Sequence, residues 1–304
     1  MAATLTLTDA LRIVEIRTKI VSVSSVLIGT AYAVYSTHHL SLVLFLLLFV
    51  AAECVDIGTA GFNSYFDFIR GVDTVDSDVD RYKVLVHRGI EPRVAFWISC
   101  GAFGLGALFG LALGVRVGWE VIGVGALGMA VSFFYSGGPL PLACTPFGEV
   151  LAGGLLGMVL IVLSTYVQTH EISSAALLLG LPSTTLIADI LTVNNTCDIQ
   201  GDAAAGRRTL SIVLGRSRSQ GVIYGLGALT YALAYLLVAL RVLPIVAVAP
   251  LTAAAVFSAR EFMRMHRRGY THATKGPSMG SISGIFITYS LAVLCGLTLG
   301  TVGR

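Results

Sequence analysis

Two stretches of the sequence place asparagine and aspartate at the ends of long apolar runs. The first begins at Asn63 and reaches Asp67, and the second begins at Asn194 and reaches Asp198. Carboxylates at the mouth of a membrane helix are energetically expensive, so they need a cation or a partner. Carboxylate and amide oxygens suit Mg²⁺ rather than zinc, and Mg²⁺ combines one or two carboxylates with phosphate oxygens of a substrate. The two stretches therefore predict a shared metal and anion site.

Further charged residues continue both stretches. At 3.6 residues per turn, Asn194, Asp198 and Asp202 would share one helical face. Arginines follow each stretch and would bind the remaining phosphate charge, bidentately where the geometry allows. These arginines are Arg70, Arg207 and Arg208. The acidic loop after Asp73 is interpreted as a solvated segment with ion pairs, and it contains Asp76, Asp78, Asp80, Arg81 and Lys83.

Composition indicates an integral membrane protein. Of the 304 residues, 55% are hydrophobic and only 12% are charged, whereas a soluble domain carries about 25% charged residues. We expect one integral domain over residues 1–304, with the lipid bilayer as its surroundings and no nucleic-acid partner. The five cysteines stand singly in mostly apolar runs, so we interpret them as reduced packing residues.

A span needs about 20 apolar residues, and lipid leaves the backbone no alternative to a helix. Nine such runs predict an all-α polytopic protein with nine transmembrane helices. The predicted spans are 14–36, 40–62, 94–115, 117–136, 148–168, 172–195, 220–240, 242–259 and 279–301.

The basic residues orient these spans. With the N-terminus in the cytoplasm, all of the 20 lysines and arginines except Arg116, Arg241 and Arg304 fall on the cytoplasmic side. Both Asn-x-x-x-Asp stretches then face the cytoplasm, at the ends of the second and sixth spans. Two pseudo-symmetric four-helix halves, with one extra span, would bring them to a common central cavity.

The motifs resemble a known family. The patterns are Asn63-x3-Asp67-x3-Gly71-x-Asp73 and Asn194-Asn195-x2-Asp198-x3-Asp202-x3-Gly206-x2-Thr209-Leu210. They resemble the paired aspartate-rich motifs of the UbiA superfamily of membrane prenyltransferases. The Gly-x-Asp ending of the first pattern and the loop 135–141 are similar to the branch that prenylates 1,4-dihydroxy-2-naphthoate in menaquinone biosynthesis. Ser64 departs from the family, which usually has an acidic residue at that position. Cys197 departs from the menaquinone branch, which commonly has an arginine there.

The resemblance implies a Mg²⁺-dependent transfer of a polyprenyl group from a polyprenyl diphosphate to an aromatic acceptor. The expected acceptor is 1,4-dihydroxy-2-naphthoate, which would give demethylmenaquinone. The implied catalytic residues are Asp67, Asp198 and Asp202. The implied metal ligands are Asn63, Asp67, Asp73, Asn194, Asp198 and Asp202, and the implied diphosphate-binding residues are Asn63, Arg70, Lys83, Asn194, Asn195, Arg207 and Arg208.

Other readings stay open at this point. The same fold could act on a hydroxybenzoate or another phenol, or cyclise the donor as a terpene cyclase. A cation transporter is a remote alternative, because its carboxylates would lie near span centres rather than at span ends beside arginines. We expect the active-site face on the cytoplasmic side of a prokaryotic plasma membrane.

Three further ionisable residues are candidates for a role. Asp56 falls on the same helical face as Asn63 and Asp67, so it is a candidate for lining the cavity. Lys19 is either a membrane-surface anchor or a contact for the acceptor carboxylate. Glu149 either acts as a base or holds the loop 135–141. His272 lies in a predicted cytoplasmic loop without ligand spacing, and no role is predicted for it.

Overall fold

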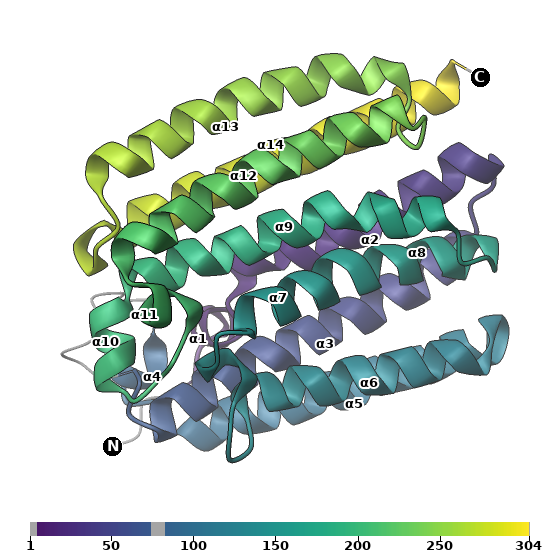
Figure 1. The fold of residues 1–304 in the computed structure, drawn as a ribbon. Coiled ribbons are helices and arrows are strands. Elements are labelled where there is room, and N and C mark those ends of the chain that lie inside the picture. The colour runs from purple at the N-terminus through teal and green to yellow at the C-terminus, as the bar shows by residue number, and fades with distance from the viewer. Residues whose placement is uncertain (1–4, 74–82, 304) are drawn as a thin grey trace. The chain divides into compact units, whose positions relative to one another are not determined.

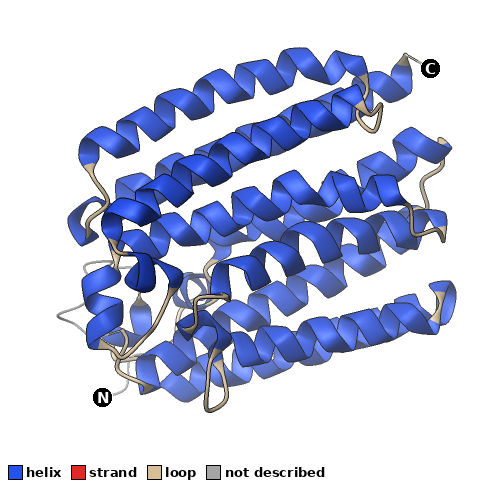
Figure 2. Cartoon of the chain, viewed as in Figure 1, coloured by secondary structure: helices blue, strands red, loops and turns tan. Residues whose placement is uncertain are grey.

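The computed structural model describes residues 5–73 and 83–303, and within these ranges it contains helices and no strand (Figure 2). Nine helical segments of the described ranges are long and apolar enough to cross a membrane. A helix satisfies its backbone hydrogen bonds internally, which is the condition for crossing lipid. The predicted all-α architecture with nine spans is therefore confirmed.

The helices extend further than the apolar runs that predict them. Helix α3 (Leu42–Ile69) continues past the predicted end at residue 62, so Asn63 and Asp67 lie inside its last two turns. Helix α9 (Ser174–Cys197) likewise continues past residue 195, the predicted end of its span, and it contains Asn194 as predicted. Adding residues to an existing helix is inexpensive, so the helix ends where the backbone turns away and not where the apolar residues stop.

The chain divides into two compact units, and each is described by itself. Unit 1 comprises the described parts of residues 1–20, 46–145 and 200–208, and unit 2 comprises those of 21–45, 146–199 and 209–304. Unit 1 contains α1 (Leu7–Ile13), η1 (Ile16–Lys19), most of α3, α4 (Val84–His87), α5 (Pro92–Val117), α6 (Trp119–Ser136), η2 (Leu142–Cys144) and most of α10 (Ile199–Ala204). Unit 2 contains most of α2 (Ile20–Thr37), α7 (Gly148–Ala152), the π-helical segment η3 (Gly153–Val159), α8 (Leu160–Thr169), α9, α11 (Leu210–Leu214), α12 (Arg216–Ala239), η4 (Ile245–Ala247), α13 (Val248–Arg268), η5 (His272–Thr274) and α14 (Lys275–Val302).

In unit 1, helix α3 packs closely against α5, and α5 and α6 run side by side in opposite directions (Figure 1). Glycines permit the close approach of α3 to α5. A Cβ atom at Gly61 would lie 2.2 Å from the Ser99 Oγ, and one at Gly58 would lie 2.3 Å from the Phe103 ring. Small residues of this kind let membrane helices pack backbone to backbone, and here they hold the polar end of α3 in place.

A small apolar cluster fixes the short helices of unit 1. Ile13 at the end of α1 packs with Val84 and Leu85 of α4, and with Ile90 before α5. All four side chains are buried. The cluster holds the start of α4 in position, and the residue just before α4 is Lys83.

In unit 2, α9 is the central helix and contacts α7, η3, α8, α11, α12 and α14. Helices α12, α13 and α14 lie side by side (Figure 1). The π-helical segment approaches α9 closely at Gly157, where a Cβ would lie 2.5 Å from the backbone nitrogen of Thr184. Helix α9 therefore packs against η3 at a distance that only a glycine permits.

Replacing Gly157 with alanine is expected to destabilise the protein, because the new methyl group would meet backbone atoms of α9. Overpacking of this kind costs about 1–3 kcal/mol, which corresponds to a fall of several °C in the unfolding temperature. Gly154→Ala in the same segment is the matched control, since a Cβ there has nothing within 4 Å. Thermal unfolding of both variants in detergent tests this, and equal unfolding temperatures would contradict the packing described here.

Candidate functional site

The end of α3 is shaped by Gly71. This glycine has φ +68°, the left-handed conformation that glycine adopts without strain. The Gly71 N–H donates to the Phe68 carbonyl at 3.1 Å, and the Val72 N–H donates to the Asp67 carbonyl at 2.9 Å. These two bonds are the Schellman pattern of a helix C-terminus. The chain thus turns back at Gly71, and Asp73 lies close to the end of the helix that carries Asp67.

The end of α10 repeats this arrangement. Gly206 has φ +75°, its N–H donates to the Ala203 carbonyl at 3.1 Å, and the Arg207 N–H donates to the Asp202 carbonyl at 2.9 Å. Asp67 and Asp202 therefore occupy the same position in two equivalent helix ends, and the spacing Asp-x3-Gly in both motifs is the sequence form of that backbone structure.

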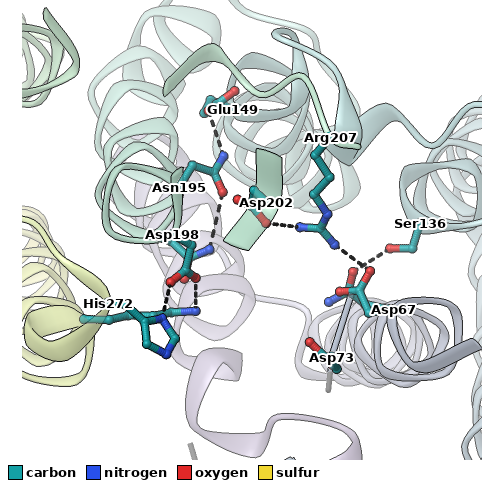
Figure 3. A network of polar contacts seen from close by, with 12 residues as sticks. Asp67, Asp73, Ser136, Glu149, Asn195, Asp198, Asp202, Arg207 and His272 are labelled. Atoms are coloured by element: carbon teal, nitrogen blue, oxygen red, sulfur yellow. Dashed lines mark hydrogen bonds and ion pairs between the residues drawn. The ribbon is translucent and has the colours of Figure 1, made fainter. Parts of the chain in front are cut away.

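Arg207 joins these two helix ends within unit 1 (Figure 3). Its guanidinium lies 2.6 Å from the Asp67 Oδ1 and 3.3 Å from the Asp202 Oδ1. Only 13% of the Arg207 side chain is exposed, against 11% for Asp67 and 8% for Asp202. Burial opposes the charged guanidinium, but the two carboxylates outweigh it and raise the pKa of Arg207 above its usual range. The arrangement is a desolvated cation between two carboxylates.

Lys83 neutralises Asp73, the second aspartate of the first motif. Its Nζ lies 3.0 Å from the Asp73 Oδ2 and 3.6 Å from the Glu15 Oε1. Burial opposes the ammonium, yet Glu15 and Asp73 together raise the pKa of Lys83 above its usual range. Lys83 and Asp73 are predicted site residues, and Glu15 is not. Glu15 follows α1 and has a left-handed backbone conformation (φ +49°).

Asn63 and Arg70 contact the end of α6 and the segment that follows it. The Ser136 hydroxyl donates to the Asn63 Oδ1 at 2.8 Å. Arg70 donates to the carbonyl of Ser136 and, at 2.6 Å, to that of Gly138, while its guanidinium lies 5.1 Å from the centre of the Phe66 ring. Both predicted site residues thus hold the loop 135–141 against the end of α3.

In unit 2, the second motif forms its own polar cluster (Figure 3). The Asn195 side-chain amide donates to the Glu149 Oε1 at 2.8 Å, and the Asn194 amide lies 3.4 Å from the Asn195 Oδ1. Asp198 contacts the His272 Nδ1 at 2.9 Å and the Lys275 ammonium. Glu149 therefore accepts a hydrogen bond from an asparagine of the motif.

The expectation that Asn194, Asp198 and Asp202 share one helical face is wrong. Helix α9 ends at Cys197, Asp198 has φ −103° and ψ 12°, and α10 starts as a new helix at Ile199. Aspartate competes with the helical backbone for hydrogen bonds and favours helix ends. At Asp198 the carboxylate is engaged by His272 and Lys275 instead.

The remaining predicted residues have ordinary surroundings. Arg208 is exposed, and only its backbone N–H, 2.9 Å from the Cys144 carbonyl, has a partner recorded in the described part of the chain. Ser64 donates to the Ile13 carbonyl at 2.8 Å. Lys19 is buried and contacts the Asp56 Oδ1 at 2.7 Å, so it is not a surface anchor and Asp56 is its ion-pair partner. Asp76, Asp78, Asp80 and Arg81 lie outside the described residues.

Sequence reasoning missed His272 and Lys275, and no local signal could have identified them. They follow Asp198 by more than 70 residues and are two of many basic or titratable side chains predicted on one side of the membrane. Only the packing of α14 against α9 in unit 2 selects them.

The donor set of both clusters fits Mg²⁺ rather than a softer metal. Asp67, Asp73 and Asp202 in unit 1 and Asp198 with Asn194 in unit 2 offer only oxygens. Over the described ranges, no three His, Cys, Asp or Glu side chains form a ready metal-binding group. Mg²⁺ in proteins takes one or two carboxylates and completes its shell with water and substrate phosphate.

Comparison with known proteins agrees with this chemistry. Residues 22–282 match the model of the UbiA prenyltransferase family. A 1,4-dihydroxy-2-naphthoate octaprenyltransferase of Bacillus subtilis (strain 168) is 35% identical over 211 residues, or 69% of this chain and 66% of that protein. The match thus spans just under two thirds of the relative's own length.

Two solved structures share the fold. The apo structure of a UbiA homolog from Aeropyrum pernix K1 has a TM-score of 0.70 at 16% identity, covering 91% of this chain and 97% of that one. A UbiA homolog from Archaeoglobus fulgidus bound to DMAPP and Mg²⁺ has a TM-score of 0.64 at 18% identity, covering 94% and 99%. The family match extends over most of the chain and over both aspartate motifs, and the protein is accordingly a member of the UbiA prenyltransferase family.

Proposed function

We propose that this protein transfers a polyprenyl group from a polyprenyl diphosphate to an aromatic acceptor, with 1,4-dihydroxy-2-naphthoate as the acceptor. The observation that carries the proposal is the pair of equivalent helix ends bearing Asp67 and Asp202, with Arg207 between them. Carboxylates and a guanidinium at the end of a membrane helix suit a substrate with an anionic head and an apolar tail. Family membership and the name of the Bacillus subtilis relative support the choice of reaction and acceptor.

The carboxylates would hold the metal. Asp67, Asp73, Asp198 and Asp202 are the proposed ligands, with Asn63 and Asn194 as amide-oxygen ligands. Mg²⁺ bound there would neutralise the charge of the diphosphate as it leaves.

The basic residues would bind the diphosphate itself. Arg207 and Lys83 now neutralise the carboxylates of unit 1. Once a metal takes those carboxylates, both cations become available to phosphate oxygens, where they would stabilise the developing charge of the leaving group. Arg70, Arg208 and Asn195 are proposed as additional contacts.

The reaction breaks the allylic C–O bond of the donor, and the bonding electrons leave with the diphosphate. An electron-rich ring carbon of the acceptor then forms the new C–C bond to the allylic cation. With a hydroxynaphthoate acceptor, the ring carboxylate leaves as CO₂, and the product is the quinol form of demethylmenaquinone. In unit 1, Phe133 packs edge to face against Phe62 and Phe66, with centroid distances of 5.2 and 5.8 Å, so we assign these rings to packing.

We also propose a location and an orientation. The nine apolar helical segments of the described ranges, together with the family, support an integral membrane protein. The one-sided distribution of lysine and arginine supports a cytoplasmic N-terminus and a cytoplasmic site. The bacterial relative supports the plasma membrane of a prokaryote.

The test is a product analysis with purified protein in detergent. The protein is incubated with Mg²⁺, a labelled polyprenyl diphosphate and a panel of aromatic acids that includes hydroxynaphthoate and hydroxybenzoate. We expect a prenylated, decarboxylated naphthoquinol by mass spectrometry. Prenylated hydroxybenzoate would change the acceptor, a cyclised donor without acceptor would indicate a terpene cyclase, and no use of the donor would overturn the proposal.

Removal of divalent metal is expected to stop the reaction reversibly. Chelation leaves the carboxylates paired with Arg207, Lys83 and Lys275, and the diphosphate then lacks most of its neutralising charge. Activity should fall to background with a chelator and return with added Mg²⁺. Full turnover in chelator would rule out the proposed role of the four aspartates.

A further inference from the structure

Two basic side chains converge on Asp198 in unit 2, His272 from the α13–α14 connection and Lys275 from the start of α14. The Lys275 ammonium contacts the Asp198 Oδ2, and the His272 Nδ1 lies 2.9 Å from the Oδ1 (Figure 3). The connection that carries His272 and leads into Lys275 is well defined, because Thr271 and Thr274 form a reciprocal capping box around η5. Both basic residues therefore have a definite place beside the second aspartate motif.

The position of Lys275 is electrostatically unfavourable for a purely structural residue. Lys275 is the first residue of α14, a helix of 28 residues. A helix N-terminus carries about half a positive charge, so it favours anions and disfavours a lysine. Arg216 stands in the same way at the first position of α12, a helix of 24 residues.

Asp198 has two basic side chains in contact, Lys275 and His272, and Lys275 also lies at the N-terminus of α14. Lys275 is 34% exposed and His272 is 43% exposed. An ammonium has three N–H donors, so Lys275 can contact a second anion.

We propose that Lys275, with His272, is a diphosphate-binding residue that Asp198 holds in place until metal and substrate arrive. This inference rests on the proposed function and adds to it a basic subsite from the last inter-span connection. When Mg²⁺ takes Asp198, Lys275 turns to the phosphate oxygens of a prenyl diphosphate. The subsite thus recognises the diphosphate group and not the prenyl chain.

A different role for Lys275 makes a different prediction for diphosphate binding. If Lys275 were only the counter-ion of Asp198, its removal would free the carboxylate, and metal would bind equally well or more tightly while diphosphate binding stayed the same. A phosphate contact instead predicts that metal binding alone does not weaken, whereas diphosphate binding at saturating metal does.

The experiment measures both affinities in the full chain in detergent. Mn²⁺ binding is followed by electron paramagnetic resonance without diphosphate, and binding of inorganic pyrophosphate and of a prenyl diphosphate is followed by calorimetry at saturating Mg²⁺. Lys275→Met should leave the Mn²⁺ affinity unchanged or increased, and should weaken both diphosphates about tenfold or more, the loss expected for one charge-assisted contact. Lys275→Arg should restore most of the diphosphate affinity.

Two further variants keep the test decisive. Arg267→Met is the matched control, since it removes one positive charge from an exposed residue of the preceding helix. Lys275→Gln can still donate a hydrogen bond to Asp198, so it serves if Lys275→Met does not fold. Diphosphate affinities of Lys275→Met or Lys275→Gln equal to that of Arg267→Met would overturn the inference while the proposed function stands. A wild-type protein that binds no prenyl diphosphate with Mg²⁺ would overturn both.

Discussion

Asp67→Asn is expected to lower prenyl transfer by about 10²–10³-fold, the range seen when one electrostatic contact to a developing charge is lost. Asparagine has nearly the shape of aspartate, so it keeps the helix end at Gly71 but removes the charge that would hold Mg²⁺. The loss should appear in the rate of a single turnover with enzyme in excess over donor, because the carboxylate acts at the leaving group. The apparent Mg²⁺ requirement should rise as well.

The control for Asp67→Asn is Glu91→Gln. Glu91 is an exposed acid of the same unit, 3.7 Å from Arg93 at the surface, and its loss should leave transfer unchanged. An Asp67→Asn protein that turns over at the wild-type rate would refute the assignment of Asp67 as a metal ligand. A variant that no longer unfolds cooperatively would instead assign it to folding, which the unfolding curve distinguishes.

Arg207→Met is expected to produce the largest loss of stability in the absence of metal. The substitution leaves two buried carboxylates without their cation, and breaking a buried ion pair from one side costs about 3–5 kcal/mol. Mg²⁺ should then recover part of that loss, because it neutralises the same carboxylates and binds only the folded protein. The wild-type protein should gain less from Mg²⁺, since its carboxylates are already balanced.

Arg208→Met is the comparison for this prediction. It removes the same charge from the neighbouring residue, whose side chain is exposed, so its unfolding temperature should stay close to that of the wild type. Unfolding temperatures of the three proteins, each with and without Mg²⁺, give the result. Equal losses in both variants, or no gain from Mg²⁺ in Arg207→Met, would show that Arg207 does not balance the cluster.

The aspartate motifs show which structural features a short segment of sequence can specify. The Asp-x3-Gly spacing specifies a backbone structure within six residues, because a left-handed glycine closes the helix onto the aspartate carbonyl. The motif could therefore be recognised without the rest of the chain. The break at Asp198 could not, since it depends on side chains that approach from α14 and η5.

The sequence by itself determined the membrane class, the nine spans and the residues of both motifs, since hydropathy and spacing depend on neighbouring residues alone. The tertiary structure decided the partners. Arg207 contacts Asp67 across 140 positions, and Lys275 contacts Asp198 across 77. Many basic residues share the predicted cytoplasmic side, and spacing cannot rank them. Helix packing selects the basic side chains that contact each carboxylate, because a desolvated charge is tolerated only where its counter-charge is in contact.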